Sequence, residues 1–560
     1  MTSPQTGRIG VQRPTPISAP RTSVRAVASA LGAAAVRVPE VTVGAAAFAV
    51  SAAFAWVPSL WYDEGATVTS ATRSWPQLWA ELHNVDAVHG LYYVLMHIWF
   101  WLVGYTPMTL RLPSALAIAV AAGLVVALGR RLGGRRLGIA AGVVFLVLPR
   151  VVWAGGEGRP YATITTLAVG LTLVGVAAAR RARPGVPWSR VGLAWWVGYG
   201  LLATVAVVFN VYLALVVVSH AVTLAWTLLS QRASARATDR TAGVTTGSEG
   251  PAPIVTRGLV RSWFAAGVGA AVLAAPVVVE VMAQSKQVAW IGGIGWATVR
   301  QVFSTAWFGG SMLFAATAWV CMVLAVVLVV RAVRKPAVTA RDLVRAQALR
   351  VVLPIVVVPT GVLLVVTALG KHLYSPKYAT LSLPFVALLV GLALTAIRPR
   401  AALVVAVLAI VAVSIPSTIA VKTPHAKQDS YWANAAAIVE RQRAQTPDAD
   451  EGVIYGSVWK HPTTTTQIIR DAYPRAFAGM TDLAATTSGA ETGRLWDTNG
   501  DIATTVPARL GDIDTVWYLG SKARDIQPDV TSTLDAEGFH VAGYWRTGSV
   551  VITEYARAPR

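Results

Sequence analysis

Long apolar stretches joined by arginine-rich connections limit the folds open to this chain more than any other feature. A helix needs about 20 apolar residues to cross a bilayer. Eleven stretches approach that length, near residues 41–59, 112–128, 137–153, 161–179, 194–209, 211–229, 262–281, 312–331, 351–369, 379–397 and 401–420. Only 13% of the residues are charged, whereas soluble domains carry about 25%. The sequence therefore predicts a polytopic α-helical membrane protein.

The basic residues between these stretches predict the direction of each span. Lysine and arginine outnumber aspartate and glutamate, 48 against 27, so the net charge is +21. In a soluble protein this charge would suggest nucleic acid as a partner. Here most cations lie in short connections, at 130–136, 180–183, 232–261, 331–350 and 398–400. Positive loops stay in the cytoplasm and contact anionic lipid, so we expect membrane lipids, and not nucleic acid, as partners.

Eleven spans satisfy this orientation, with the N-terminus in the cytoplasm and the C-terminus outside the cell membrane. Leu91–Tyr105 is apolar and aromatic but short for a span, and counting it as a crossing conflicts with the basic loops. We expect it to lie in or dip into the outer leaflet, anchored by its tyrosines and tryptophans. The alternative is that this segment does cross, which gives twelve or thirteen spans.

Composition divides the chain into three regions. Residues 1–40, rich in Pro, Ser, Thr and Arg, predict a disordered basic cytoplasmic tail and not a cleaved signal peptide. Residues 41–420 predict the membrane domain, with a first outer loop at 60–111 and a flexible cytoplasmic loop at 234–256. Residues 421–560 predict a small extracytoplasmic α/β domain. Its expected elements are a helix at 431–443, strands at 452–455, 515–519, 539–545 and 550–555, and a turn at 546–548.

Two adjacent carboxylates, Asp63 and Glu64, directly follow the first apolar stretch. Ionisable groups at a membrane boundary are costly and are commonly kept for function. A carboxylate within hydrogen-bonding distance of a hydroxyl can remove its proton, and partial burial raises the carboxylate pKa toward working pH. The alternative is a helix cap or an ordinary loop charge. Of the two, we expect Asp63 to act as a base and Glu64 to support it.

Two further clusters fall on the predicted outer face. Asp86 and His89 precede an apolar helix, where they would bind sugar hydroxyls, hold a divalent ion or cap the helix. No paired-histidine spacing supports the metal. Glu157 and Arg159 lie between two apolar stretches. The guanidinium suits a phosphate or carboxylate ligand, and the alternative is a structural salt bridge.

A last cluster, Lys371 to Tyr378, is basic although it lies on the outer side, against the positive-inside trend. Lys371 and Lys377 therefore suggest an anionic ligand such as a lipid phosphate, with ordinary loop charge as the alternative. The chain has no Walker A sequence and no GxGxxG after a strand, so energy for a reaction would come from an activated substrate. The lone Cys321 excludes an intramolecular disulfide framework, and no cofactor is indicated.

These motifs occur in an order that resembles a known group of enzymes. Along the chain they are Trp61-Tyr62-Asp63-Glu64, His89-Gly90-Leu91-Tyr92-Tyr93, Arg111-Leu112-Pro113-Ser114-Ala115, Glu157-Gly158-Arg159-Pro160-Tyr161-Ala162 and Pro376-Lys377-Tyr378. Residues 41–400 resemble the GT-C membrane glycosyltransferases of the protein-mannosyltransferase and aminoarabinose-transferase type (glycosyltransferase family 39-like), especially the actinobacterial branch. The chain departs from the pattern at Gly90, where relatives often have paired prolines, and at Lys377, where arginine is common.

The resemblance implies an inverting sugar transfer from a polyprenyl-phosphate donor on the outer face of the membrane. Asp63 would be the base, and Arg159, Lys371, Lys377 and Arg111 are the candidates to hold the lipid phosphate. The other expected substrate-binding residues are Asp86, His89, Glu157, Tyr161 and Tyr378. Mannose is the favoured sugar and arabinofuranose the second, and the acceptor would be a glycan, lipid or protein of the cell envelope.

Two other classes of protein remain open. A transporter or flippase of a lipid-linked sugar would need charged or broken helices near mid-membrane and paired halves. A non-catalytic envelope-assembly protein would use the outer domain for binding alone. The enzyme hypothesis requires Asp63, Glu157 and Lys377 to meet at one site, although they lie far apart in the chain.

Overall fold

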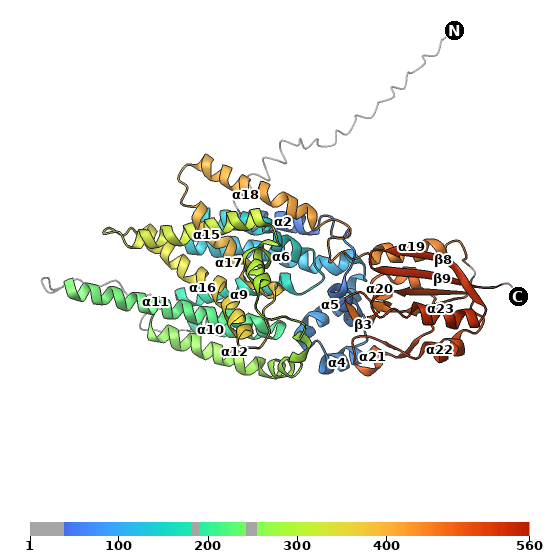
Figure 1. The fold of residues 1–560 in the computed structure, drawn as a ribbon. Helices are drawn as coiled ribbons and strands as arrows, with labels where there is room; N and C mark the ends of the chain where they lie inside the picture. Colours follow the sequence, from blue (N-terminus) through green and yellow to red (C-terminus); the bar gives the residue numbers. More distant parts are fainter. Residues whose placement is uncertain (1–37, 182–189, 242–254, 448, 559–560) are drawn as a thin grey trace, which may run out of the picture.

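A helical bundle and a C-terminal sheet domain lie end to end in this protein (Figure 1). The computed structural model describes residues 38–181, 190–241, 255–447 and 449–558. The expected tail at 1–40 therefore lies outside the described residues up to position 37, and helix α2 (Pro39–Ala52) begins directly after it.

Nine helical segments among the described residues are long and apolar enough to cross a membrane, or ten if the bent pair α7 (Arg135–Val147) and α8 (Pro149–Gly155) is one span. The nine are α6 (Pro107–Gly133), α9 (Tyr161–Arg181), α10 (Arg190–Phe209), η2 (Val211–Leu213) with α11 (Ala214–Thr241), α12 (Arg257–Ala283), α15 (Met312–Val333), α16 (Ala340–Ala368), η5 (Pro376–Ser382) with α17 (Leu383–Leu394), and α18 (Arg400–Ala420). Each coincides with a predicted apolar stretch. The predicted polytopic helical fold is confirmed.

Two predicted spans differ from straight crossings. The stretch 41–59 forms only the 14-residue α2, which ends at Ala52 and gives way to turns. This accounts for the difference between the eleven expected spans and the ten found in the described part of the chain. The stretch 137–153 bends by 66° between α7 and α8. Pro149 causes the break, because proline lacks an N–H and moves the residue before it, Leu148, out of helical geometry.

The predicted first outer loop, 60–111, is mostly helical. It contains α3 (Tyr62–Ala71), α4 (Trp75–Asn84), η1 (Ala87–His89) and α5 (Gly90–Val103). α5 has 14 residues, which confirms a short apolar helix within the Leu91–Tyr105 segment. Trp101 is 79% exposed, as expected of an interfacial anchor, but Tyr92 and Tyr93 are buried in the core, so the expectation that they anchor the segment is wrong. Whether α5 lies in the outer leaflet stays a prediction.

The flexible loop expected at 234–256 is wrong at its start, because residues 234–241 are helical. α11 continues as helix to Thr241, residues 242–254 lie outside the described residues, and α12 begins at Arg257. The connection between α12 and α15 contains η3 (Ser285–Val288), α13 (Trp296–Arg300), the π-helical η4 (Gln301–Thr305) and α14 (Ala306–Phe308).

The C-terminal domain contains a five-stranded sheet in the order β4-β1-β7-β9-β8. Its strands are β1 (Glu451–Tyr455), β4 (Thr481–Asp482), β7 (Thr515–Gly520), β8 (Phe539–Thr547) and β9 (Val550–Arg557). β1 pairs in parallel with β4 and β7, and the other pairs are antiparallel. The predicted helix (α19, Trp432–Arg443) and four strands are confirmed. β8 runs to Thr547, so the turn lies later than predicted, at Gly548 with φ +58°.

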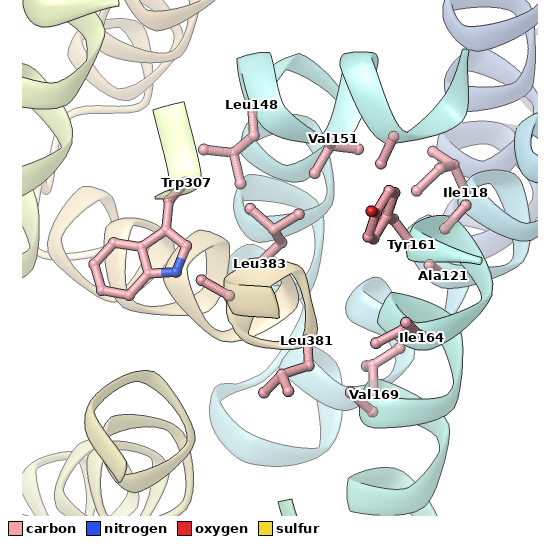
Figure 2. Packing of buried hydrophobic residues seen from close by; sticks show 14 of the residues in the cluster. Ile118, Ala121, Leu148, Val151, Tyr161, Ile164, Val169, Trp307, Leu381 and Leu383 are labelled. Atoms are coloured by element: carbon pink, nitrogen blue, oxygen red, sulfur yellow. The ribbon is translucent and has the colours of Figure 1, made fainter. Parts of the chain in front are cut away.

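Close packing joins the two parts of the molecule. One apolar core extends from the bundle into the C-terminal domain, and Figure 2 shows its part around Tyr161. A Cβ atom at Gly65 of α3 would lie 2.6 Å from the Ile468 side chain in α20 (Gln467–Ala472) and 3.1 Å from Trp432. A side chain at position 65 would therefore force Ile468 to shift. The C-terminal domain therefore holds in place the helix that carries Asp63 and Glu64.

Candidate functional site

Asp63 and Lys377 form the accessible part of the site. The Lys377 Nζ atom lies 2.6 Å from Asp63 Oδ2, although 314 residues separate them. Both side chains keep some exposure, 19% for Asp63 and 23% for Lys377. The ammonium also lies 4.6 Å from the ring centre of Trp61, close enough for a cation–π contact. A carboxylate and a cation are thus paired where a substrate can reach them.

Arg159 connects Asp63 with the Asp86 cluster. Its Nη1 donates to the Asp63 carbonyl at 3.1 Å and to the Tyr93 hydroxyl at 3.2 Å. Tyr93 in turn donates to Asp86 Oδ2 at 2.7 Å. Burial raises the pKa of Asp86, and the nearby Arg159 opposes that shift. His89, one turn before Tyr93, is half-buried, and its Nδ1 atom is buried without a hydrogen-bond partner. The structure therefore brings Asp63, Asp86, His89, Arg159 and Lys377 together.

Glu64 belongs to a fully buried ion network behind this surface. Arg111 donates to both its carboxylate oxygens, at 2.8 and 2.6 Å, and Lys427 Nζ lies 2.8 Å from Oε1. Lys427 also lies 2.9 Å from Glu157, whose other oxygen accepts from Trp61 Nε1 at 3.0 Å. Burial raises the pKa of Glu64, but Arg111 and Lys427 outweigh it and lower this pKa to about 2. Two anions balance two cations.

This network places Arg111 and Glu157 in the interior instead of on the substrate side. Neither has exposed surface, and the Nη1 of Arg111 is taken up by the carbonyls of Ala55 and Pro58. Arg111 is therefore left out of the proposed phosphate site. Lys371 is exposed and is not part of the Asp63 cluster.

Two predicted tyrosines lie at the edges. Tyr161 is buried with its ring 5.1 Å from that of Trp153, while Tyr378 stacks on Tyr212 at 4.3 Å. Both follow charged residues of the site, Arg159 and Lys377, by one or two positions. They pack the walls around the charged centre.

Sequence reasoning missed three residues near this centre. Lys427 follows the last span closely, where the chain was assigned to the outer domain. His461 in the hairpin of β2 (Ser457–Val458) and β3 (His461–Thr465) stacks on Tyr62 with ring centres 3.6 Å apart. Arg150 lay inside a predicted span, and its charge there was the signal that could have found it.

Metal chemistry receives no support from clustering. Across the described ranges, no three His, Cys, Asp or Glu side chains gather closely enough to hold a metal ion. The expectation that the protein needs no cofactor stays a prediction.

A second buried pair ties the segment between α3 and α4 to the C-terminal domain. Arg73 Nη1 lies 2.6 Å from Glu81 Oε2, and its Nη2 donates to the carbonyls of Arg494 and Leu495. Burial raises the pKa of Glu81 from 4.5 to about 7, although Arg73 opposes it. The Glu81 carboxyl group therefore binds its proton more tightly in the folded protein than in the unfolded chain.

The stability that protonated Glu81 contributes is fully present below pH 4.5 and is lost as the pH rises through about 7. We expect the melting temperature of the wild type to fall across this interval more than that of Glu81→Gln. Thermal unfolding followed by tryptophan fluorescence in detergent measures both. The exposed Glu537→Gln should keep the wild-type slope, and equal slopes for all three proteins would contradict the prediction.

Among known proteins, the chain resembles solved structures of membrane proteins in its fold. The chain matches no family model and no curated protein. Among solved structures, it matches ArnT from Cupriavidus metallidurans in the apo state with 14% identity and a TM-score of 0.52, covering 93% of this chain and 98% of ArnT. The same protein bound to undecaprenyl phosphate gives 13% identity and a TM-score of 0.51, with the same coverage.

The archaeal oligosaccharyltransferase AglB from Archaeoglobus fulgidus, in complex with an inhibitory peptide and a dolichol-phosphate, matches with 12% identity and a TM-score of 0.45, over 94% of this chain and 75% of that one. Of these matches, only those to ArnT have a TM-score above 0.5, and at 13–14% identity they show a shared fold. The chain has the GT-C type of architecture, a polytopic helical membrane domain followed by a C-terminal sheet domain.

Proposed function

We propose that this protein is an inverting glycosyltransferase that moves a sugar from a polyprenyl-phosphate donor to a cell-envelope acceptor. The observation that carries the proposal is the pairing of Asp63 with Lys377 at the accessible centre of a GT-C fold. Binding of undecaprenyl phosphate by ArnT, whose fold the chain shares, supports the class of donor. Mannose is the sugar we favour, and arabinofuranose is the second choice.

The reaction would be a single displacement. Asp63 takes the proton from the acceptor hydroxyl as its oxygen attacks the anomeric carbon. The bond between this carbon and the phosphate oxygen breaks on the opposite face, and the phosphate leaves with the electron pair. Lys377 and Arg159 stabilise the charge that develops on the phosphate. Because only one displacement occurs, the anomeric configuration inverts.

Lys377 has a double role in this scheme. In the structure it neutralises Asp63, and its remaining exposure lets it contact an incoming phosphate as well. Arg159 is held by the backbone carbonyl of Asp63 and by the Tyr93 hydroxyl, so it does not depend on the donor for its position. Both cations thus contact Asp63, Lys377 through the carboxylate and Arg159 through the backbone carbonyl.

The C-terminal domain would form the acceptor side of the site. His461 stacks on Tyr62, the residue before Asp63, and Trp496 donates to the Tyr62 hydroxyl at 3.2 Å. Trp459, at the tip of the same β2–β3 hairpin, is 48% exposed. The exposed Trp459 and the half-buried His461 suit an acceptor with hydroxyl groups and apolar ring faces.

One observation bears on the transporter alternative. The 66° break between α7 and α8 is the kind of broken helix that transporters use. It is the sole such pair in the described ranges, so no matching break marks a second half. The enzyme is therefore the function that we favour.

A donor panel tests the proposal. Purified protein in lipid nanodiscs is given labelled polyprenyl-phosphate mannose, arabinofuranose and glucose, together with cell-envelope extract as acceptor. We expect label to move from one of these donors to the acceptor and none from nucleotide sugars. Transfer from nucleotide sugars alone, or movement of intact donor across the bilayer without transfer, would contradict it.

A further inference from the structure

Arg150 differs from the other buried arginines of this protein. Four arginines in the described residues are at most 8% exposed, namely Arg73, Arg111, Arg150 and Arg159. Three of them donate to carboxylates, carbonyls or hydroxyls. In the part of the chain that the structure describes, Arg150 has no hydrogen-bond acceptor and no ion-pair partner, and its Nε is fully buried. Its charge therefore lacks a structural explanation.

The contact that Arg150 does make is aromatic. Its guanidinium lies 3.7 Å from the ring centre of Trp153, one turn later in α8. A cation–π contact returns less free energy than the removal of a charge from water costs. Glu157, the nearest carboxylate along the chain, is already engaged by Lys427 and Trp61. A buried guanidinium kept without an anion suggests that the anion is a ligand.

Two other buried donors without acceptors come from α14, which packs on α8, and from the stretch just before η5, which also packs on α8. The hydroxyl of Tyr374, three residues before Lys377, is unpaired, and so is the indole N–H of Trp307 in α14. Tyr374 is close enough to Arg150 to feel its charge. Figure 2 shows Trp307 in the same apolar cluster as Leu148, the residue at the break before α8.

The turn after α14 packs against the start of α8, where Arg150 lies. Gly309 adopts φ +60°, and a Cβ there would lie 3.3 Å from the Pro149 side chain and 3.8 Å from the backbone nitrogen of Arg150. The guanidinium and the indole can only donate hydrogen bonds, and the phenol can donate one. A phosphate group offers only acceptors and negative charge, so it is the complementary ligand.

We propose that Arg150, together with Tyr374 and Trp307, forms a subsite for the phosphate group of the lipid donor. This inference rests on the proposed function and adds to it a cation that was absent from the predicted set. Because Tyr374 and Lys377 lie on one short segment, the subsite adjoins the Asp63–Lys377 pair. A phosphate held here and at Lys377 would leave its sugar carbon directed toward Asp63.

Binding of farnesyl phosphate to the full-length protein in nanodiscs tests the subsite without any transfer step. We expect Arg150→Gln to weaken this binding at least tenfold and to leave binding of farnesol unchanged. Arg150→Lys should give an intermediate loss, because it keeps the charge without the planar fork. The matched control, the exposed Arg334→Gln, should bind like the wild type.

Binding of inorganic phosphate distinguishes a subsite for the phosphate group alone from a subsite that also needs the lipid tail. A loss of inorganic phosphate binding in Arg150→Gln, parallel to the loss of farnesyl phosphate binding, would support a subsite that recognises the phosphate group itself. A loss with farnesyl phosphate alone would support a subsite that needs the lipid tail. Unchanged binding of both phosphates, or an equal loss of farnesol binding, would overturn the proposal.

Thermal stability distinguishes a ligand-binding arginine from a structural one. Removing an unpaired buried charge should leave the melting temperature of the free protein unchanged or raise it, and farnesyl phosphate should stabilise the wild type more than Arg150→Gln. A large drop in the free protein's melting temperature would assign Arg150 to the packing. Phosphate binding by a protein that transfers no sugar would remove the proposed function and leave the subsite.

Discussion

Asp63→Asn is expected to reduce sugar transfer by about a thousandfold while the protein stays folded. The amide that replaces the carboxylate cannot accept the proton of the acceptor hydroxyl. It also releases Lys377 from its ion pair. Because this pair is partly exposed, its loss should cost less than about 1 kcal/mol of stability. The initial rate of label transfer in nanodiscs, measured with the donor that the wild type uses, gives the effect.

Two further variants make this result specific to the base. Asp63→Glu keeps a carboxylate but displaces it, so it should retain part of the activity, whereas the exposed Asp512→Asn should keep all of it. Donor binding by Asp63→Asn should remain, since the proposed phosphate ligands are cations. Turnover within tenfold of the wild type would remove Asp63 as the base.

The membrane fold could be predicted from the sequence because long apolar helices leave an unambiguous composition signal. The errors arise where backbone geometry interrupts that signal. Residues 41–59 are apolar enough for a span, yet α2 ends at Ala52 and the chain turns. In 137–153 the apolar run hides Pro149, whose ring breaks the helix. Hydropathy averages over a window, so it does not detect a single residue that redirects the chain.

The candidate site could be predicted only in part. The sequence indicates which residues lie on the same side of the membrane, but not which of their side chains touch. Placing Asp63 and Lys377 on one face of the membrane was enough to group them, and the structure brings them to 2.6 Å. The same reasoning grouped Arg111 with the phosphate ligands, although it pairs with Glu64 in the interior. Lys427 was missed because an isolated lysine after the last span carries no motif. Its role depends on its ion pairs with Glu64 and Glu157, which are distant in the sequence.

Arg111→Met is expected to have the largest effect on stability of any single substitution in this network. It leaves Glu64 and Glu157 buried with Lys427 as their one cation, so one negative charge is uncompensated. Breaking a buried ion pair in this way costs about 3–5 kcal/mol. It also frees the carbonyls of Ala55 and Pro58 from their donor. Thermal unfolding in detergent, or the half-life of folded protein at a fixed temperature, measures the loss.

The double variant Glu64→Leu/Arg111→Met separates charge imbalance from lost packing. It removes one anion and one cation, so Lys427 and Glu157 remain as a balanced pair. We expect it to be more stable than Arg111→Met alone, a coupling that a double-mutant cycle quantifies. Arg130→Met, which breaks the partly exposed pair with Glu40, should cost less than about 1 kcal/mol. If the double variant were less stable than Arg111→Met, packing and not charge balance would be the reason for these four buried residues.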